Sequence, residues 1–183
     1  MWVAAAGYTR AMRDQHTDVP PGLELIDPLT FGPEQRCFGC GPGNRIGMNL
    51  RFYRDGDEVV TWLRAQEGWE GPPGVLHGGL QATLADEVGA WTVVGLRGRF
   101  GFTTSLRMRF LRPARVDAPI EARGRITAES EGMVTVAVTL RQGEKNLARG
   151  QASFVIPTVE MAEKSLGMPL PESWRRLARS GDS

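Results

Sequence analysis

The segment GVLHGGLQATLADEVGAW, residues 74–91, organises this chain. It opens with a glycine turn and continues as a long, largely apolar helix pattern over about residues 77–95. The middle of that pattern holds two acids, Asp86 and Glu87. A carboxylate on a buried helix costs several kcal/mol unless it is paired or put to use, so an acid here indicates chemistry. The alternative is that both acids lie on a solvated stripe of an ordinary amphipathic helix.

The start of this predicted helix suits a developing oxyanion. Helices begin with unpaired backbone N–H groups and a positive dipole end. Gly78 and Gly79 have no side chains, so a substrate carbonyl can approach those N–H groups closely. Asp86 follows Gly78 by eight residues, which is ~12 Å along a helix axis. One helix therefore cannot bring both features to one reacting carbon, whereas two antiparallel copies can, and we expect a symmetric dimer with shared sites.

The segment resembles the signature of the hotdog-fold acyl-CoA thioesterases, in particular the phenylacetate-pathway type and its relatives with a His-Gly-Gly turn. In that family a catalytic Asp follows the His by nine residues, which is the spacing of His77 and Asp86. Residues 103–114 resemble the family's strand that ends in a Phe-Leu-Arg-Pro corner. Residues 37–50 are similar to the opening of many members, and the resemblance covers roughly residues 37–157.

The resemblance implies an α+β hotdog fold, in which an antiparallel sheet wraps round one long central helix. It divides the chain into an N-terminal extension (1–36), a hotdog domain (37–157) and a C-terminal tail (158–183). Short helices are expected near Thr9–His16 and Glu172–Arg179. Alternation of apolar and polar residues predicts a hairpin and four strand-like runs. These are 47–54 with 58–64, and then 101–112, 119–129, 133–142 and 146–156.

Bulk composition excludes several classes of protein. The 183 residues are 41% hydrophobic and 23% charged, which is ordinary globular material for one domain with appendages. The net charge of +1, from 22 basic and 21 acidic residues, gives no field that favours nucleic acid or membrane. No apolar run approaches ~20 residues, and the first residues lack a basic leader. Two cysteines do not make a disulfide scaffold, so we expect a cytoplasmic protein.

The resemblance assigns the leading chemical role to Asp86, which in the family either attacks the thioester carbonyl or activates a water for that attack. The N–H of Gly78 or Gly79 would polarise the thioester, and a hydroxyl at Thr103 would hold the attacking water. Asp86 paired with an arginine, and Thr103 as an ordinary strand residue, are the structural alternatives. Glu87 should point elsewhere, since adjacent helical residues diverge by ~100°.

His77 either orients the turn or the substrate, or is a structural residue. Arg112 is the candidate contact for the phosphates of coenzyme A, because the planar guanidinium suits phosphate. Arg107 and Arg109 alternate onto one face of their strand, which we expect to be the outer, solvated face. Candidate residues for the acyl pocket are also what the core of such a fold requires; they are Leu84, Val88, Trp91, Phe100 and Phe102.

Cys37 and Cys40 admit three interpretations. Zinc requires four ligands, and one chain offers two cysteines and no nearby histidine, although a dimer could pool two pairs. A thioredoxin-like role expects a βαβ setting, whereas this pair precedes a hairpin. Two small buried residues in a glycine-rich turn is the interpretation that we favour. No metal and no cofactor is therefore expected.

The sequence departs from the phenylacetate type at one point. Some members carry an asparagine shortly before the His-Gly-Gly turn, and this chain has Glu70-Gly71-Pro72-Pro73 there, so aromatic substrates are not carried over. The prediction is an acyl-CoA thioesterase acting as a homodimer or a dimer of dimers, with acyl-CoA as its substrate. The main alternative is a hotdog protein that binds acyl-CoA as a sensor without hydrolysing it. A hotdog hydratase would require an Asp–His hydration motif that the sequence lacks.

Overall fold

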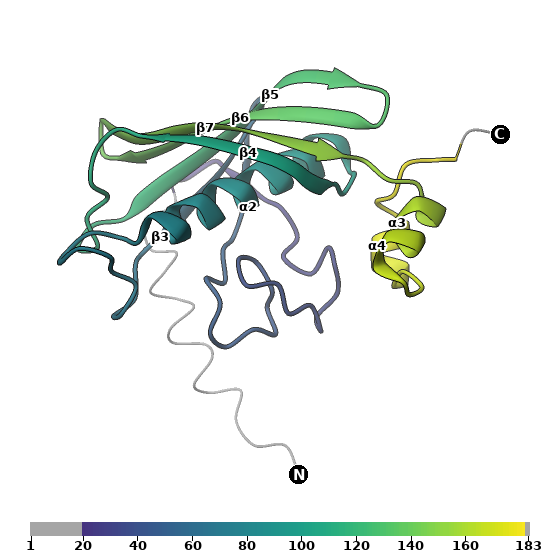
Figure 1. The fold of residues 1–183 in the computed structure, drawn as a ribbon, viewed down its shortest axis with the longest axis horizontal. Coiled ribbons are helices and arrows are strands. Elements are labelled where there is room, and N and C mark those ends of the chain that lie inside the picture. Colours follow the sequence, from purple (N-terminus) through teal and green to yellow (C-terminus); the bar gives the residue numbers. More distant parts are fainter. Residues whose placement is uncertain (1–19, 182–183) are drawn as a thin grey trace, which may run out of the picture.

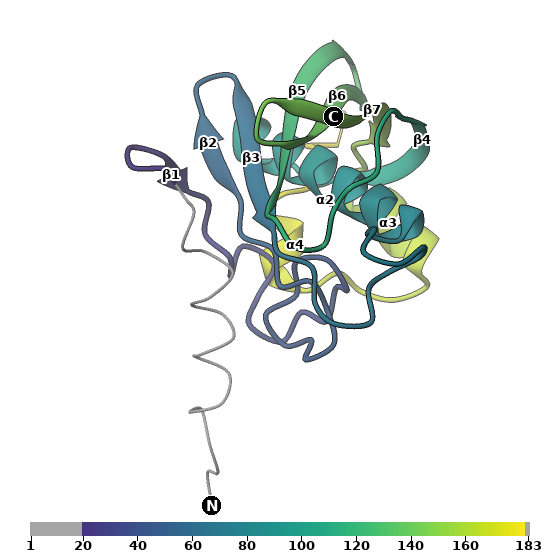
Figure 2. The ribbon, with the colours of Figure 1, turned by 90° about the vertical axis from the view of Figure 1, so that its left-hand side faces the viewer.

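The structure is a computed structural model and describes residues 20–181. A seven-stranded antiparallel sheet curves round helix α2 (Gly78–Arg97), which lies along its concave face (Figures 1 and 2). This is the α+β arrangement that the sequence predicted. In sheet order the strands are β1 (Glu24–Leu25), β2 (Tyr53–Asp55), β3 (Glu58–Leu63), β5 (Ile120–Ser130), β6 (Met133–Gln142), β7 (Lys145–Val155) and β4 (Phe102–Phe110).

Helix α2 has defined signals at both ends. His77 is its N-cap, with a side chain that accepts a hydrogen bond from the backbone N–H of Gly79. Gly98 ends it in the left-handed conformation at φ 60°, where a residue without a Cβ is favoured. The helix therefore runs two residues beyond the predicted end at residue 95. Leu84, Ala85 and Val88 on it are fully buried.

Helix and sheet approach each other closely at glycine positions. A Cβ on Gly89 of α2 would lie 3.0 Å from the ring of Phe154 on β7. A Cβ on Gly124 of β5 would lie 2.2 Å from the Thr92 hydroxyl oxygen and 3.1 Å from the Val88 carbonyl oxygen. A side chain at Gly124 would require the Thr92 side chain or the helix to move, so these two glycines allow α2 to pack close to the sheet.

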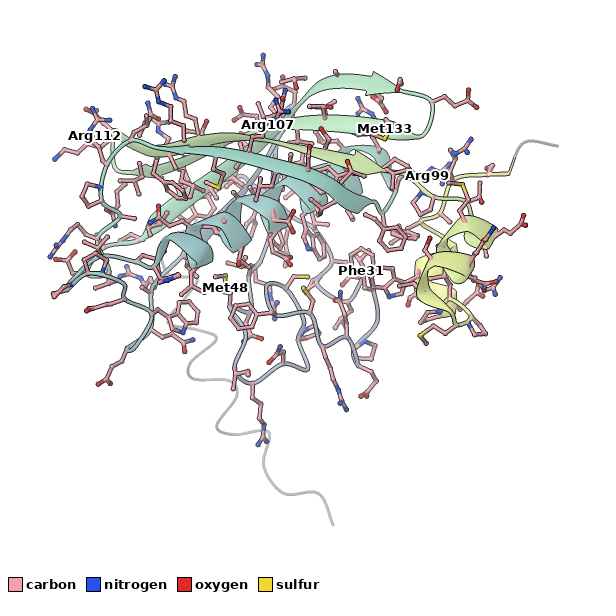
Figure 3. The ribbon with its side chains drawn as sticks, in the orientation of Figure 1. Phe31, Met48, Arg99, Arg107, Arg112 and Met133 are labelled. Carbon is pink, nitrogen blue, oxygen red and sulfur yellow. The ribbon has the colours of Figure 1, made fainter. Side chains whose placement is uncertain are left out.

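An irregular segment covers the side of α2 that faces away from the sheet. Figure 3 shows Phe31 and Met48 on that side. The Trp91 indole stacks on Phe52, with ring centroids 4.8 Å apart and 8° between planes, and meets the edge of Phe31 at 5.6 Å. Ile26 and Phe31 thus share one hydrophobic core with the predicted hotdog domain, although they precede residue 37.

The strands agree with the predicted runs to within two residues, except at the hairpin. There β2 has only three residues because residues 47–52 form an irregular loop. In that loop Asn49 has a φ of 50°, and the Leu50 N–H donates to the Gly39 carbonyl rather than to a strand partner. The sequence pattern does not predict β1, and the expected helix at Thr9–His16 lies outside the described residues.

The C-terminal tail contains a helix that the sequence did not reveal. α3 (Val159–Leu166) begins at Thr158, whose hydroxyl accepts from the Met161 N–H, and ends at Gly167. α4 covers Glu172–Arg175, four residues shorter than predicted. Trp174 of α4 contacts both Phe31 and Phe100, with centroids 4.4 Å and 5.2 Å away, so the tail docks against the core at one end of the sheet (Figure 1).

Gly124→Ala should lower the free energy of unfolding by about 1–3 kcal/mol, because the added methyl group overlaps the buried Thr92 hydroxyl. Denaturant unfolding measures the change. In the double variant with Thr92→Ala the clash is relieved, and part of the loss should be recovered. A Gly124→Ala protein as stable as the wild type would show that the helix does not sit this close to the sheet.

Candidate active site

Asp86 lies on the one long stripe of α2 that the core does not bury. The stripe is defined by Gly79, Thr83, Asp86 and Ala90, which recur at helical spacing and are exposed or half-buried. The sheet and the irregular segment bury most of the rest of the helix, where Leu80, Ala82 and Glu87 are also half-buried. The stripe faces strand β4. Asp86 therefore lies at the boundary between the protein interior and the solvent-exposed surface.

The carboxylate of Asp86 is held by a strand residue. The Thr103 hydroxyl on β4 donates a hydrogen bond of 2.9 Å to Asp86 Oδ1. Burial raises the pKa of Asp86 above its ordinary value, and this hydrogen bond opposes the rise. No basic group forms an ion pair with Asp86 within residues 20–181, so the alternative of a simple Asp–Arg pair is not realised there.

A β-bulge turns Thr103 toward the helix. Leu106 pairs with Ala152 and Thr103 pairs with Phe154, and both partners face α2. Leu106 and Thr103 are three positions apart, so strict alternation would place them on opposite faces of the strand. The register shift between Thr103 and Ser105 supplies the extra residue, and Thr104 is tied down by a hydrogen bond to the Ser153 carbonyl. Bulges of this kind re-aim side chains beside functional sites.

The N-terminus of α2 leaves one backbone donor open. The Gly79 N–H donates to His77 Nδ1 at 3.0 Å, and the N–H groups of Leu80 and Gln81 donate to the His77 carbonyl. The Gly78 N–H has no acceptor among the described residues. Of the two predicted oxyanion donors, the structure therefore leaves Gly78 available and engages Gly79 in the cap.

Strand β4 forms the edge of the sheet. It pairs only with β7 among the described strands, so the backbone N–H and C=O groups that point outward along this nine-residue strand have no strand partner. Phe110 at its end and Leu111 just beyond it are 53% and 40% exposed. A long open edge flanked by exposed apolar side chains is a surface that another strand can pair with.

The predicted substrate-binding residues fall into two groups. Leu84, Val88, Trp91 and Phe100 are buried in the core, and Phe102 is partly buried against it. A role for these residues in acyl binding stays a prediction. Arg112 follows the end of β4, where one guanidinium nitrogen donates to the Asn146 carbonyl at 2.8 Å. Arg107 and Arg109 are exposed, and Figure 3 shows Arg107 on the outer side of the sheet.

The Glu87 side chain points away from that of Asp86, as the helical geometry predicted. It contacts the loop that contains Cys37 and Cys40. The Cys37 sulfur and Glu87 Oε1 lie 2.9 Å apart and share a hydrogen bond. Burial raises the pKa of Glu87 well above its usual range. A hydrogen bond from Cys40 lowers the pKa of Cys37 to about 5, and the same contact raises the pKa of Cys40. The sequence predicted the glycine-rich turn but gave no sign that Glu87 joins it.

Comparisons with known proteins agree with this architecture. Residues 73–148 match the family model of the thioesterase superfamily. A crystal structure of a thioesterase superfamily protein superposes with a TM-score of 0.61 at 23% identity, covering 81% of this chain and 77% of that one. No curated protein sequence matches the chain.

Two further solved structures are similar. A putative thioesterase related to phenylacetic acid degradation, from Ralstonia eutropha JMP134, has a TM-score of 0.55 and 22% identity, covering 60% of this chain and 86% of that one. A thioesterase from Haemophilus influenzae has a TM-score of 0.54 and 19% identity, with coverage of 59% and 78%. The chain therefore has the hotdog fold of the thioesterase superfamily, and the resemblance predicted from the sequence is confirmed. None of its described helices has the length and apolar character needed to cross a membrane.

His77→Ala should lower the free energy of unfolding by about 1 kcal/mol, because it removes the side-chain acceptor that caps α2. His77→Asn should retain most of the stability, since asparagine is a good N-cap. Thermal or denaturant unfolding of the two variants compares them. A His77→Asn protein of normal stability whose hydrolytic rate falls at least about 100-fold would contradict a purely structural role and assign chemistry to the imidazole.

Proposed function

We propose that this protein hydrolyses the thioester of an acyl-CoA, giving a free acid and coenzyme A. The observation that carries the proposal is the contact between the half-buried Asp86 and the re-aimed Thr103. Thioester hydrolysis in general is supported by the match to the thioesterase superfamily. The sensor alternative gives no reason for the protein to maintain a desolvated carboxylate and a bulge that serves it.

Asp86 acts as the general base in this proposal. Thr103 donates its proton to Asp86 Oδ1, so its own lone pairs are free to accept from a water molecule. That water lies within reach of the second carboxylate oxygen, which takes its proton as the oxygen attacks the thioester carbon. The tetrahedral intermediate then collapses, the carbon–sulfur bond breaks, and the proton on Asp86 passes to the departing thiolate. A raised pKa favours both proton transfers near neutral pH.

The Gly78 N–H is the proposed donor to the oxyanion. Because Gly78 and Asp86 lie ~12 Å apart along one helix, the site combines Gly78 of one protomer with Asp86 of its partner. The surfaces that suit this assembly are the open edge of β4 and the small-residue stripe of α2 beside it. Two-fold symmetry then produces two equivalent sites.

Coenzyme A is the proposed leaving group. One guanidinium nitrogen of Arg112 donates a hydrogen bond to the Asn146 carbonyl, and this bond orients the side chain. The other guanidinium N–H groups remain as donors for a phosphate. Arg115 lies against Gly74 in the turn that precedes α2. Both cations therefore stand at the end of the molecule where α2 begins, on the same side as the proposed oxyanion donor.

Asp86→Asn should lower kcat on a good acyl-CoA substrate by at least about 100-fold with an unchanged fold, because the amide cannot accept the proton from water. Release of free thiol measures the rate, and circular dichroism checks the fold. Glu87→Gln is the matched control, and it should retain most of the activity. Near-normal kcat in Asp86→Asn would refute the assignment, and an inactive Glu87→Gln protein would move the catalytic acid by one residue.

The shared site is testable by complementation. Gly78→Pro deletes only the free N–H: proline suits the first position of a helix, and His77 before it has an extended ψ of 134°. Gly78→Ala keeps the N–H and is the control. Asp86→Asn and Gly78→Pro should each be nearly inactive alone. A statistical 1:1 mixture of the two variants should recover about one quarter of the wild-type rate, because about half of its dimers are heterodimers and each heterodimer has one of its two sites intact. No recovery, or an active monomer, would contradict the shared site.

A further inference from the structure

Cys37, Cys40 and Glu87 form a compact group of potential metal ligands. One ligand atom from each residue lies within 4.8 Å of the other two. In a tetrahedral zinc site with Zn–S bonds of about 2.3 Å and Zn–O bonds of about 2.0–2.2 Å, the ligand atoms are about 3.5–3.8 Å apart. Small rotations of the three side chains therefore bring the sulfurs and the carboxylate oxygen to coordination distance.

A tight turn holds the two cysteines close together beside Glu87. The Cys37 sulfur lies 2.9 Å from Glu87 Oε1, and Cys37 is half-buried while Cys40 is buried. The thiolate is the form of cysteine that binds metal, so binding requires both thiols to lose their protons. The short Cys-x-x-Cys turn is closed by the Gly41 N–H, which donates to the Cys37 carbonyl at 3.0 Å.

The third ligand is brought in by a close contact between the loop and α2. A Cβ on Gly39 would lie 2.2 Å from Glu87 Cδ. The loop that contains Cys37 and Cys40 therefore packs this closely against the Glu87 carboxyl group only because residue 39 is glycine. Glu87 lacks an ion-pair partner among the basic residues of the described chain. A desolvated acid beside two thiols, with no cation near it, is an environment that a positive ion would stabilise.

We propose that Cys37, Cys40 and Glu87 of one chain bind a zinc ion. The two thiols lose their protons to solvent as the Zn–S bonds form, Glu87 supplies one carboxylate oxygen, and a water molecule completes the tetrahedron. The ion ties the 37–50 loop to α2 one residue away from Asp86. The sequence predicted no metal because one chain offers two cysteines and no nearby histidine; the structure adds a third potential ligand, Glu87, from a distant segment.

Cobalt titration of the reduced, metal-free full-length protein tests the site. Co²⁺ in a thiolate site gives charge-transfer absorption in the near ultraviolet and strong visible bands when tetrahedral. We expect one Co²⁺ per chain, displaced by Zn²⁺, and roughly half the charge-transfer intensity in Cys37→Ser or Cys40→Ser. Glu87→Gln should retain the two-thiolate absorption and bind the ion at least about tenfold more weakly. The matched control is Asp86→Asn, the neighbouring acid that points to Thr103, and it should bind normally.

Several outcomes would overturn the proposal. These are no thiolate absorption, unchanged affinity in Glu87→Gln, or half an ion per chain, which would show cysteine pairs pooled between protomers. A Cys37–Cys40 disulfide that forms as readily with zinc present as without it would also exclude the site. Zinc should raise the melting temperature of the wild type and not that of Cys40→Ser, which gives a readout that is independent of hydrolysis.

Discussion

The close contact between α2 and the concave face of the sheet constrains every other feature of this protein. Gly89 and Gly124 let the helix approach until side chains and backbone touch, and the Phe31–Phe52–Trp91 cluster covers its opposite side. One stripe remains, beside β4, and Asp86 is the charged group on it. The acid is therefore fixed by packing at the boundary between a low-dielectric interior and the surface, which is where its pKa rises while its oxygens stay accessible.

Two local departures from regular secondary structure complete the candidate active site around Asp86. The bulge at Thr103 brings a hydroxyl to the carboxylate, and the His77 cap engages one glycine N–H while leaving the next one open. Each feature departs from regular secondary structure, and each acts on a polar atom that the proposed reaction uses. The same reasoning leads to the proposed dimer: a rigid helix separates its open N–H from its acid, so in the proposed reaction a second chain supplies the missing half of each site.

Much of this was readable in the sequence, for identifiable reasons. The apolar pattern of residues 77–95, its terminal glycine and the alternation of the later strands predicted the helix and the sheet, and the family resemblance supplied the fold. Asp86 stood out because nothing in an apolar helix calls for an acid. Alternation alone, in contrast, would place Thr103 on the outer face with Arg107, because a bulge leaves no mark in the residue pattern. The contact of Glu87 with Cys37 joins residues 50 positions apart, and only the folded chain reveals it.

The central claim is that one reacting carbonyl lies between the Gly78 N–H of one protomer and Asp86 of its partner. A crystal structure with a non-hydrolysable acyl-CoA analogue, in which a methylene group replaces the thioester sulfur, tests this most directly. The account predicts a ketone oxygen within hydrogen-bonding distance of Gly78 N, and the ketone carbon facing Asp86 and Thr103 of the other chain. A ketone held by Gly78 and Asp86 of the same chain, or bound away from both, would contradict it.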